Sequence, residues 1–347
     1  MRLDRRTISS IILSLIAAVT VVGTGFSFKH RSDFSGTILA VANGSPQDED
    51  YHGIRAFKTY VEAASGGQLT VTIFNYGEFC GSDRECMGFL RSGLLDIFMT
   101  TAGGVGYLFG PAQIIDMPYA FSDEALAECV LDGPLAAELQ SAVARSGLPM
   151  RLMVIANTGG WRSFATIARA IRNPQDLRGM KIRTTSAEMQ QVFVRQFAAT
   201  PVPISWAESY IAMATGIVDG TTNSLSDIVA GNLHERIKYI TLDNHSYMGA
   251  FWWYSQKKWA ALDAADRRVI SSGFERLKME TRNRAKLNHK KATKTFIEQG
   301  GTIIALSPRQ RRAFEDASHG VAKWFETQYG AQWLHLLDRA VARCQKS

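Results

Sequence analysis

The sequence lacks the short motifs that mark several large enzyme classes. Its 347 residues contain no H-E-x-x-H helix motif of metalloproteases, no G-x-S-x-G turn of serine hydrolases and no phosphate-binding loop. The glycines of AGGVGYLFG, at 102–110, do not have the spacing of the dinucleotide-binding fingerprint. We interpret this segment as a tight turn where the backbone comes close to a neighbour or a ligand. The sequence therefore predicts no cofactor.

Cysteine and histidine, the usual ligands of structural zinc, are also scarce. The chain has four cysteines and seven histidines, and no histidine stands near a cysteine pair at ligand spacing. His52, His234 and His245 are scattered along the chain, and we interpret each as a core or surface residue. Asp219, in VDGTTN, precedes a glycine, which is typical of turns rather than of catalytic acids. We therefore predict no metal site and no catalytic residue.

Strong charge of either sign is missing from the chain as a whole. The formal net charge of +7 is mild for this length and predicts no nucleic-acid partner. One basic segment, RLKMETRNRAKLNHKKATK at 276–294, lies on a predicted helix; it is either a solvated face or a surface for an acidic partner. Apolar residues make up 46% and charged residues 20%, which indicates a globular chain long enough for two domains.

The first residues differ in character from the rest. Three arginines lie within the first six residues, and an apolar run follows from 8 to 26. This layout is typical of a secretory signal, although the run is almost long enough for a membrane anchor. We therefore assign 1–28 as a signal peptide or N-terminal anchor. In both cases the body of the protein lies outside the cytoplasm, and we expect the periplasm.

An even number of cysteines in an exported chain favours disulfides. Cys80 and Cys86 flank the turn CGSDREC, so a local bridge is easy to close. The remaining pair, Cys129 and Cys344, would tie the C-terminal tail to the body. The alternative is that some of the four are buried free thiols.

Strand-like and helix-like segments alternate along the body. Such alternation predicts an α/β fold with parallel strands and helices on the sheet faces. A first half ends in a strand at 150–157, and a second half begins after a crossing near 157–162. Ser205 and Glu208 have the spacing of a capping box that would begin a helix. The strands are expected at 37–43, 69–75, 94–101, 150–157, 181–185, 200–204, 217–223 and 245–255, and an unusually long helix at 264–299.

Arg183 is the strongest candidate for a binding residue. It ends the short strand of KIRTT, and ligands of such sheets bind at the carboxyl ends of strands. No acidic residue lies close to it on the same strand. A buried guanidinium needs a counter-charge, which is either a distant Asp or Glu or the carboxylate of a ligand.

The motifs around Arg183 resemble those of a known family. NPQDLRGMKIRTT resembles the P-x-D-L-x-G-x-K-I-R signature of the solute-binding proteins of TRAP transporters, the DctP-type extracytoplasmic receptors. ATPVPISWAESYIAMATGIVDGTTN resembles the next block of that family. DMPYAF, VLDGP and RECMGFLRSGLLDI also match in order and spacing, so the resemblance covers roughly 36–330.

The resemblance implies a two-lobed, periplasmic-binding-protein-like architecture with a long helix spanning both lobes. We predict lobe I from 36–159 and 248–288, and lobe II from 160–247 and 289–347. It further implies an organic acid held in the cleft between the lobes. The implied partners are a small-molecule carboxylate ligand and the small and large membrane subunits of a TRAP permease, and the implied protein is not an enzyme. An exported enzyme acting on a small organic acid is the alternative.

Residue by residue, the resemblance implies a set of ligand contacts. Arg183, in K-I-R, would hold the carboxylate, and Arg162, in GGWRSF, would make a second contact. Further implied contacts are Asn223, Trp206 and Asn43. Some family members carry Glu and Arg after the strand DIFMTT, where this sequence has AGGVG. That departure favours a smaller or more apolar carboxylate than a sugar acid.

Overall fold

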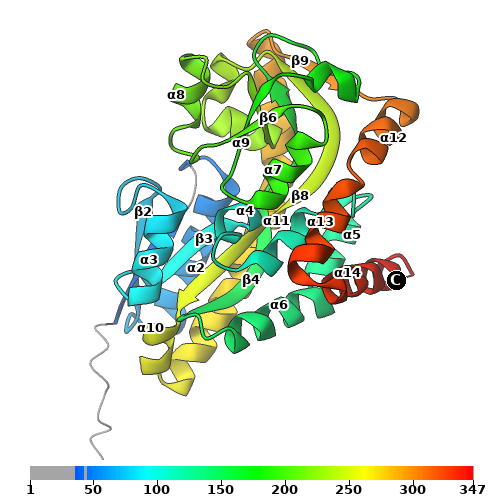
Figure 1. Cartoon of the computed structure of the whole chain (residues 1–347). Helices are drawn as coiled ribbons and strands as arrows, with labels where there is room; N and C mark the ends of the chain where they lie inside the picture. The colour runs from blue at the N-terminus through cyan, green and yellow to red at the C-terminus, as the bar shows by residue number, and fades with distance from the viewer. Residues whose placement is uncertain (1–35, 43–44, 347) are drawn as a thin grey trace, which may run out of the picture. The chain divides into compact units, whose positions relative to one another are not determined.

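The structure is a computed structural model that describes residues 36–42 and 45–346. Its strands form a single nine-stranded mixed sheet. The strand order is β2-β1-β3-β8-β4-β7-β5-β6, with β9 paired to β8. Figure 1 shows the long strands β4 and β8, which pair with each other. The predicted α/β class is confirmed. The signal or anchor predicted at 1–28 lies outside the described residues. None of the described helices is both long enough and apolar enough to span a bilayer.

The N-terminal part of the sheet is parallel, as predicted. β1 (Thr37–Ala42) pairs with β2 (Thr70–Asn75) and with β3 (Ile97–Thr101). The crossovers are α2 (Glu49–Ala64) and α3 (Asp83–Ser92), each begun by a side-chain N-cap. Helical crossovers of this kind join parallel neighbours, so the carboxyl ends of β1 and β3 lie at the same edge.

Two 17-residue strands form the centre of the sheet. β4 (Met150–Thr166) and β8 (Tyr239–Ser255) pair in antiparallel fashion. The prediction that this strand ends at 157 is therefore wrong, because β4 continues through the crossing. Its register shifts between Asn157 and Trp161, where Gly159 and Gly160 adopt φ of 75° and 83°. With these positive φ angles the two glycines form a β-bulge, and the strand continues beyond them.

The remaining strands extend the sheet on the other side of β4. β7 (Gly220–Asn223) pairs antiparallel with β4 and parallel with β5 (Lys181–Thr184), and β6 (Thr200–Pro203) forms the edge. The predicted capping box is wrong: the helix α8 (Ser209–Ala214) begins four residues after Ser205, with Glu208 as its N-cap residue. The Ser205 hydroxyl instead donates to Glu208 Oε2 at 2.7 Å.

The predicted long helix is confirmed as α11 (Ala264–Glu298). It packs along α2, β4, α9 (Leu225–Ala230) and β9 (Thr302–Ala305), and so it contacts elements from both halves of the chain. The described residues fall within one compact unit, and the lobe boundaries stay a prediction.

In the basic segment, Arg284 pairs with Glu280 and Arg282 pairs with Asp132. Part of this segment is thus neutralised within the chain.

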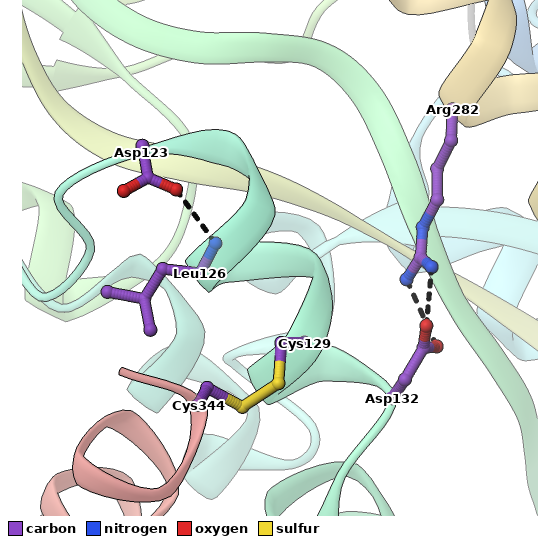
Figure 2. Close-up of a disulfide and its surroundings, with 6 residues drawn as sticks. All are labelled: Asp123, Leu126, Cys129, Asp132, Arg282 and Cys344. Carbon is purple, nitrogen blue, oxygen red and sulfur yellow. Dashed lines mark hydrogen bonds and ion pairs between the residues drawn. A yellow bond between two sulfur atoms is a disulfide. The ribbon is translucent and has the colours of Figure 1, made fainter. Parts of the chain in front are cut away.

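Both predicted disulfides are present. Cys80–Cys86 lies before and within α3, and Cys129–Cys344 joins α5 (Glu124–Leu131) to the last helix, α14 (Ala331–Cys344). Figure 2 shows this second bridge beside the ion pair of Arg282 with Asp132, which follows α5. The remaining helices are α4 (Ala102–Val105), η1 (Gly110–Asp116), α6 (Pro134–Arg145), η2 (Pro174–Leu177), α7 (Glu188–Arg195), η3 (Leu233–Glu235), α10 (Gln256–Ala261), α12 (Pro308–Ala317) and α13 (Gly320–Tyr329).

Candidate functional site

A cavity lies where strands from both halves of the sheet end. It has a volume of about 60 Å³. Four of the five predicted binding residues line it: Arg162, Arg183, Trp206 and Asn223. The fifth, Asn43, lies outside the described residues. The other lining residues are Ser45, Asp48, Asp83, Met99, Thr101, Thr158, Thr185, Asp227, Ala230, Gly231 and Met248.

Arg183 projects from β5 and is only 3% exposed. Its Nε donates to the backbone carbonyl of Ile204 at 2.9 Å, and its guanidinium lies 5.9 Å from the centre of the Trp206 ring. Burial lowers the pKa of Arg183 to about 10, and the neighbouring charge of Arg162 lowers it further, whereas Asp83 acts in the opposite direction. The guanidinium is therefore held at the cavity wall by an uncharged acceptor and an aromatic face.

Arg162 enters the same cavity from β4, directly after the bulge at Gly159 and Gly160. It is 2% exposed, and its Nη1 donates to the carbonyl of Thr222 at 2.7 Å. Burial lowers the pKa of Arg162, and the carboxylates of Asp116 and Asp227 partly offset this effect. Two guanidinium groups thus converge on one small space.

Asn223 and Trp206 complete the part of the site that the sequence predicted. Asn223 ends β7, and its side-chain oxygen accepts from the backbone nitrogen of Ser224 at 2.7 Å. Trp206 lies between β6 and α8, with its ring against Gly231, where an added Cβ would stand 2.8 Å from the indole. Any larger residue at 231 would displace the ring from the cavity wall.

The glycine-rich segment after β3 is a short helix, α4, rather than the predicted tight turn. Its glycines do serve a close approach, as predicted. An added Cβ at Gly103 would stand 2.4 Å from Thr185 Oγ1, and one at Gly104 would stand 2.5 Å from Asp83 Oδ2. The absence of side chains therefore lets α4 pack directly against two residues that line the cavity.

Sequence reasoning missed the acidic side chains of the cavity. Asp48 is the N-cap of α2 and accepts from the backbone nitrogens of Ser45 and Tyr51, and Asp227 lies in α9. Burial raises the pKa of both, and of the adjacent Glu49 and Asp50. The N-cap position before a helix was a signal for Asp48, whereas nothing in the sequence brings α9 beside it. Within the described ranges, no group of three or more His, Cys, Asp or Glu side chains has the geometry to hold a metal ion.

We expect the ligand-free protein to be more stable near pH 4 than near pH 7, partly because of Asp83. Burial raises the pKa of this carboxyl from 3.8 to about 6, although Arg183 acts against the shift. The folded state then binds the proton more tightly than the unfolded state between about pH 4 and pH 6, so stability falls as the pH rises through that range. The whole pKa shift would correspond to a loss of about 3 kcal/mol in the free energy of unfolding. Because the Asp83 side chain is only partly buried, we expect a loss of about 1–2 kcal/mol.

Urea unfolding at pH 4, 5, 6 and 7 measures this effect. Asp83→Asn is expected to be less pH-dependent than the parent by that amount, and the exposed Asp316→Asn is the control for the loss of one carboxylate. Equal pH dependence of the parent and Asp83→Asn would contradict the assignment.

Comparison with known proteins gives the family. The model of DctP, bacterial extracellular solute-binding protein, family 7, matches residues 40–328. The chain is 28% identical over 287 residues to a solute-binding protein of Verminephrobacter eiseniae, covering 83% of this chain and 84% of that protein. It is 27% identical over 313 residues to the ectoine-binding periplasmic protein of Halomonas elongata, covering 84% and 86%.

A solved structure shares the fold. The TRAP periplasmic solute-binding protein from Sulfurospirillum deleyianum, with bound succinate, matches with a TM-score of 0.81 at 23% identity, covering 88% of this chain and 97% of that one. The sequence motifs, the family model and relatives of matching length agree with one another. The chain therefore belongs to the DctP family of TRAP solute-binding proteins, the bacterial extracellular solute-binding proteins of family 7.

Proposed function

We propose that this protein is the extracytoplasmic receptor of a TRAP transporter and binds an organic carboxylate between Arg183 and Arg162. The observation that carries this proposal is the convergence of two buried guanidinium groups, from β5 and β4, on one cavity. A planar guanidinium matches a carboxylate with two parallel hydrogen bonds. Asn223 takes a further polar group of the ligand, and the Trp206 ring contacts its apolar part.

Closure of two lobes around the ligand follows from where these contacts lie. Arg162, Arg183, Trp206 and Asn223 belong to the proposed lobe II, whereas Thr101 and Asp83 of the same cavity belong to lobe I. A ligand that contacts both sides favours the closed state over the open one. Each charge-assisted hydrogen bond contributes about 1.5–3 kcal/mol, so two or three of them with aromatic packing give micromolar affinity or better.

The charges and size of the cavity favour a small monocarboxylate. Asp83 and Asp227 line the same space as the two arginines and attract them, so the positive charge there is already partly balanced. A second carboxylate on the ligand would face these acids. Relatives bind different compounds by name, ectoine in one case and succinate in another, so the choice of ligand rests on the residues of this cavity.

Delivery to a membrane permease completes the proposal. The protein is exported to the periplasm by its N-terminal segment, captures the acid without transforming it, and presents the closed form to the small and large membrane subunits of a TRAP permease. Membership of an extracellular solute-binding family supports this role. No cofactor takes part.

A thermal-shift panel tests the proposal. Pyruvate, lactate, 2-oxobutyrate and benzoate are compared with succinate, malate and glucuronate at one concentration and at pH 7.5. At 100 times its Kd, a ligand adds about 2.7 kcal/mol, which corresponds to roughly 5 °C for a chain of this size. We expect at least one monocarboxylate to reach that shift and the dicarboxylates to give less. Proton NMR of the incubated acid serves as the control: chemical conversion of the acid would contradict a receptor role.

A further inference from the structure

Arg162 also lines a second, much smaller cavity. This cavity offers about 10 Å³, which is close to the space that one water molecule needs. Its lining combines apolar side chains with several polar ones. The lining residues are Asp116, Pro118, Arg162, Met189, Gln190, Phe193, Thr222, His245 and Ser246.

Three buried polar atoms of these residues have no hydrogen-bond partner among the described residues. They are Nε of Arg162, Nε2 of His245 and Oδ1 of Asp116. The three residues are 2%, 2% and 5% exposed, and they come from β4, β8 and η1. A buried polar group without a partner costs about 1–3 kcal/mol, so three of them around one cavity need an explanation.

The neighbours of His245 determine which of its ring nitrogens is left without a partner in the part of the chain that the structure describes. Nδ1 lies 2.7 Å from Oδ2 of Asp243, and the Tyr119 hydroxyl donates to the same oxygen at 3.1 Å. The backbone nitrogen of Phe164 donates to Oδ1 of Asp243 at 3.0 Å, so this acid is a carboxylate acceptor. A ring proton on Nδ1 satisfies this contact, and in that tautomer Nε2 is free to accept a hydrogen bond.

Asp116 is anchored equally well on its other side. Its Oδ2 accepts from Nε2 of Gln190 at 2.8 Å. The side-chain oxygen of Gln190 accepts from the Thr185 hydroxyl at 2.9 Å, and Thr185 lines the ligand cavity two residues after Arg183. Oδ1 of Asp116 is left as a second acceptor that faces no donor within the described ranges; burial raises the pKa of this carboxyl, and the charge of Arg162 acts against that rise.

We propose that one structural water fills this cavity, accepting a hydrogen bond from Arg162 Nε–H and donating one each to His245 Nε2 and Asp116 Oδ1. One donor and two acceptors match the two hydrogens and the lone pairs of a single water. Asp116 and His245 are then positioning residues for Arg162. With Nη1 bound to Thr222 and Nε bound to the water, the plane of the guanidinium is fixed before a ligand arrives. The role in ligand binding rests on the proposed function, whereas the water does not.

The first test needs no ligand. In ¹⁵N-labelled protein, Arg162→Lys identifies the Nε–H signal of Arg162 by its loss. We expect this proton to exchange slowly and to show a cross-relaxation peak to a long-lived water, and a crystal structure to show one water within 3.2 Å of all three atoms. An empty cavity in the crystal together with no water contact in the spectrum would overturn the proposal.

Two variants with a matched control test the positioning. His245→Phe keeps the ring between Phe164 and Phe193, whose centres lie 5.2 Å and 4.5 Å away, but removes the acceptor. Ser246→Val fills the cavity from the facing strand if His245→Phe fails to fold. We expect either change to speed exchange of the Arg162 Nε–H at least tenfold. The control is His234→Phe, a second buried histidine that lines neither cavity.

Ligand affinity tests whether the positioning of Arg162 matters for binding. The ligand is whichever of pyruvate, lactate, 2-oxobutyrate and benzoate gives the largest thermal shift. We expect the Kd to rise about tenfold in His245→Phe, equivalent to about 1.4 kcal/mol, and to stay constant in His234→Phe. Unchanged affinity with a displaced water would overturn the positioning role. If no acid binds the parent protein, the proposed function fails, and the exchange measurement alone decides whether the water is present.

Discussion

Replacing Arg183 with alanine is expected to lower the affinity for the bound carboxylate at least 100-fold and to abolish the ligand-induced thermal shift. The guanidinium offers two charge-assisted hydrogen bonds of about 1.5–3 kcal/mol each, and its removal also leaves Asp83 facing the ligand. Arg183→Lys is expected to recover only part of the loss, because an ammonium cannot present two parallel donors. Isothermal titration with the strongest acid of the panel gives both affinities.

Arg178→Ala is the matched control for this experiment. Arg178 lies five residues earlier, after η2, and its side chain is exposed away from the cavity. The substitution Arg178→Ala removes the same charge from the same segment. Because Arg178 does not line the cavity, we expect the affinity to stay within twofold of the parent value. Ligand-free melting temperatures of both variants separate lost binding from lost folding. Equal binding by Arg183→Ala and the parent would refute the assignment of the carboxylate site to Arg183.

The site was predictable from sequence where one strand or one turn defines it. KIRTT is a short strand in both the pattern and the structure, so the location of Arg183 at a strand end followed from local information. The same holds for Asn223, which ends β7. Local patterns have limits at the bulge of β4. Gly159 and Gly160 are typical of a break, and pairing with β8 at Asn157 and again at Trp161 holds the strand continuous through them.

Contacts between distant segments account for what was missed. Asp48 and Asp227 are 179 positions apart, and they meet because α2 and α9 both pack against α11. His245 was interpreted as a core or surface residue, and it is buried. Its Nε2 is left without a partner among the described residues because Asp243, two residues earlier, engages Nδ1, and the cavity beside Nε2 also receives Asp116 from η1. Neither relation leaves a spacing that a sequence can reveal.

Removing the long-range disulfide is expected to have the largest effect on stability. In the chain-entropy model, a bridge between residues 215 positions apart contributes about 5 kcal/mol, whereas one that spans six positions contributes about 2 kcal/mol. The double variant Cys129→Ser/Cys344→Ser is therefore expected to lose more than twice the unfolding free energy lost by Cys80→Ser/Cys86→Ser. Urea unfolding of both variants and the parent, at one pH, measures the difference.

The location of the bridge also predicts which helix loses protection from amide hydrogen exchange when the bridge is removed. Cys344 is on the last helix, and α14 also packs against α5 and α6, while Arg282 holds Asp132, the C-cap residue of α5, three residues after Cys129 (Figure 2). Without the bridge, α14 is expected to exchange its amide hydrogens faster than α5, because the ion pair still restrains α5. The ligand cavity contains no residue of either helix, so carboxylate affinity is expected to stay unchanged. Uniform acceleration of exchange throughout the chain would instead show that the bridge stabilises only the global fold.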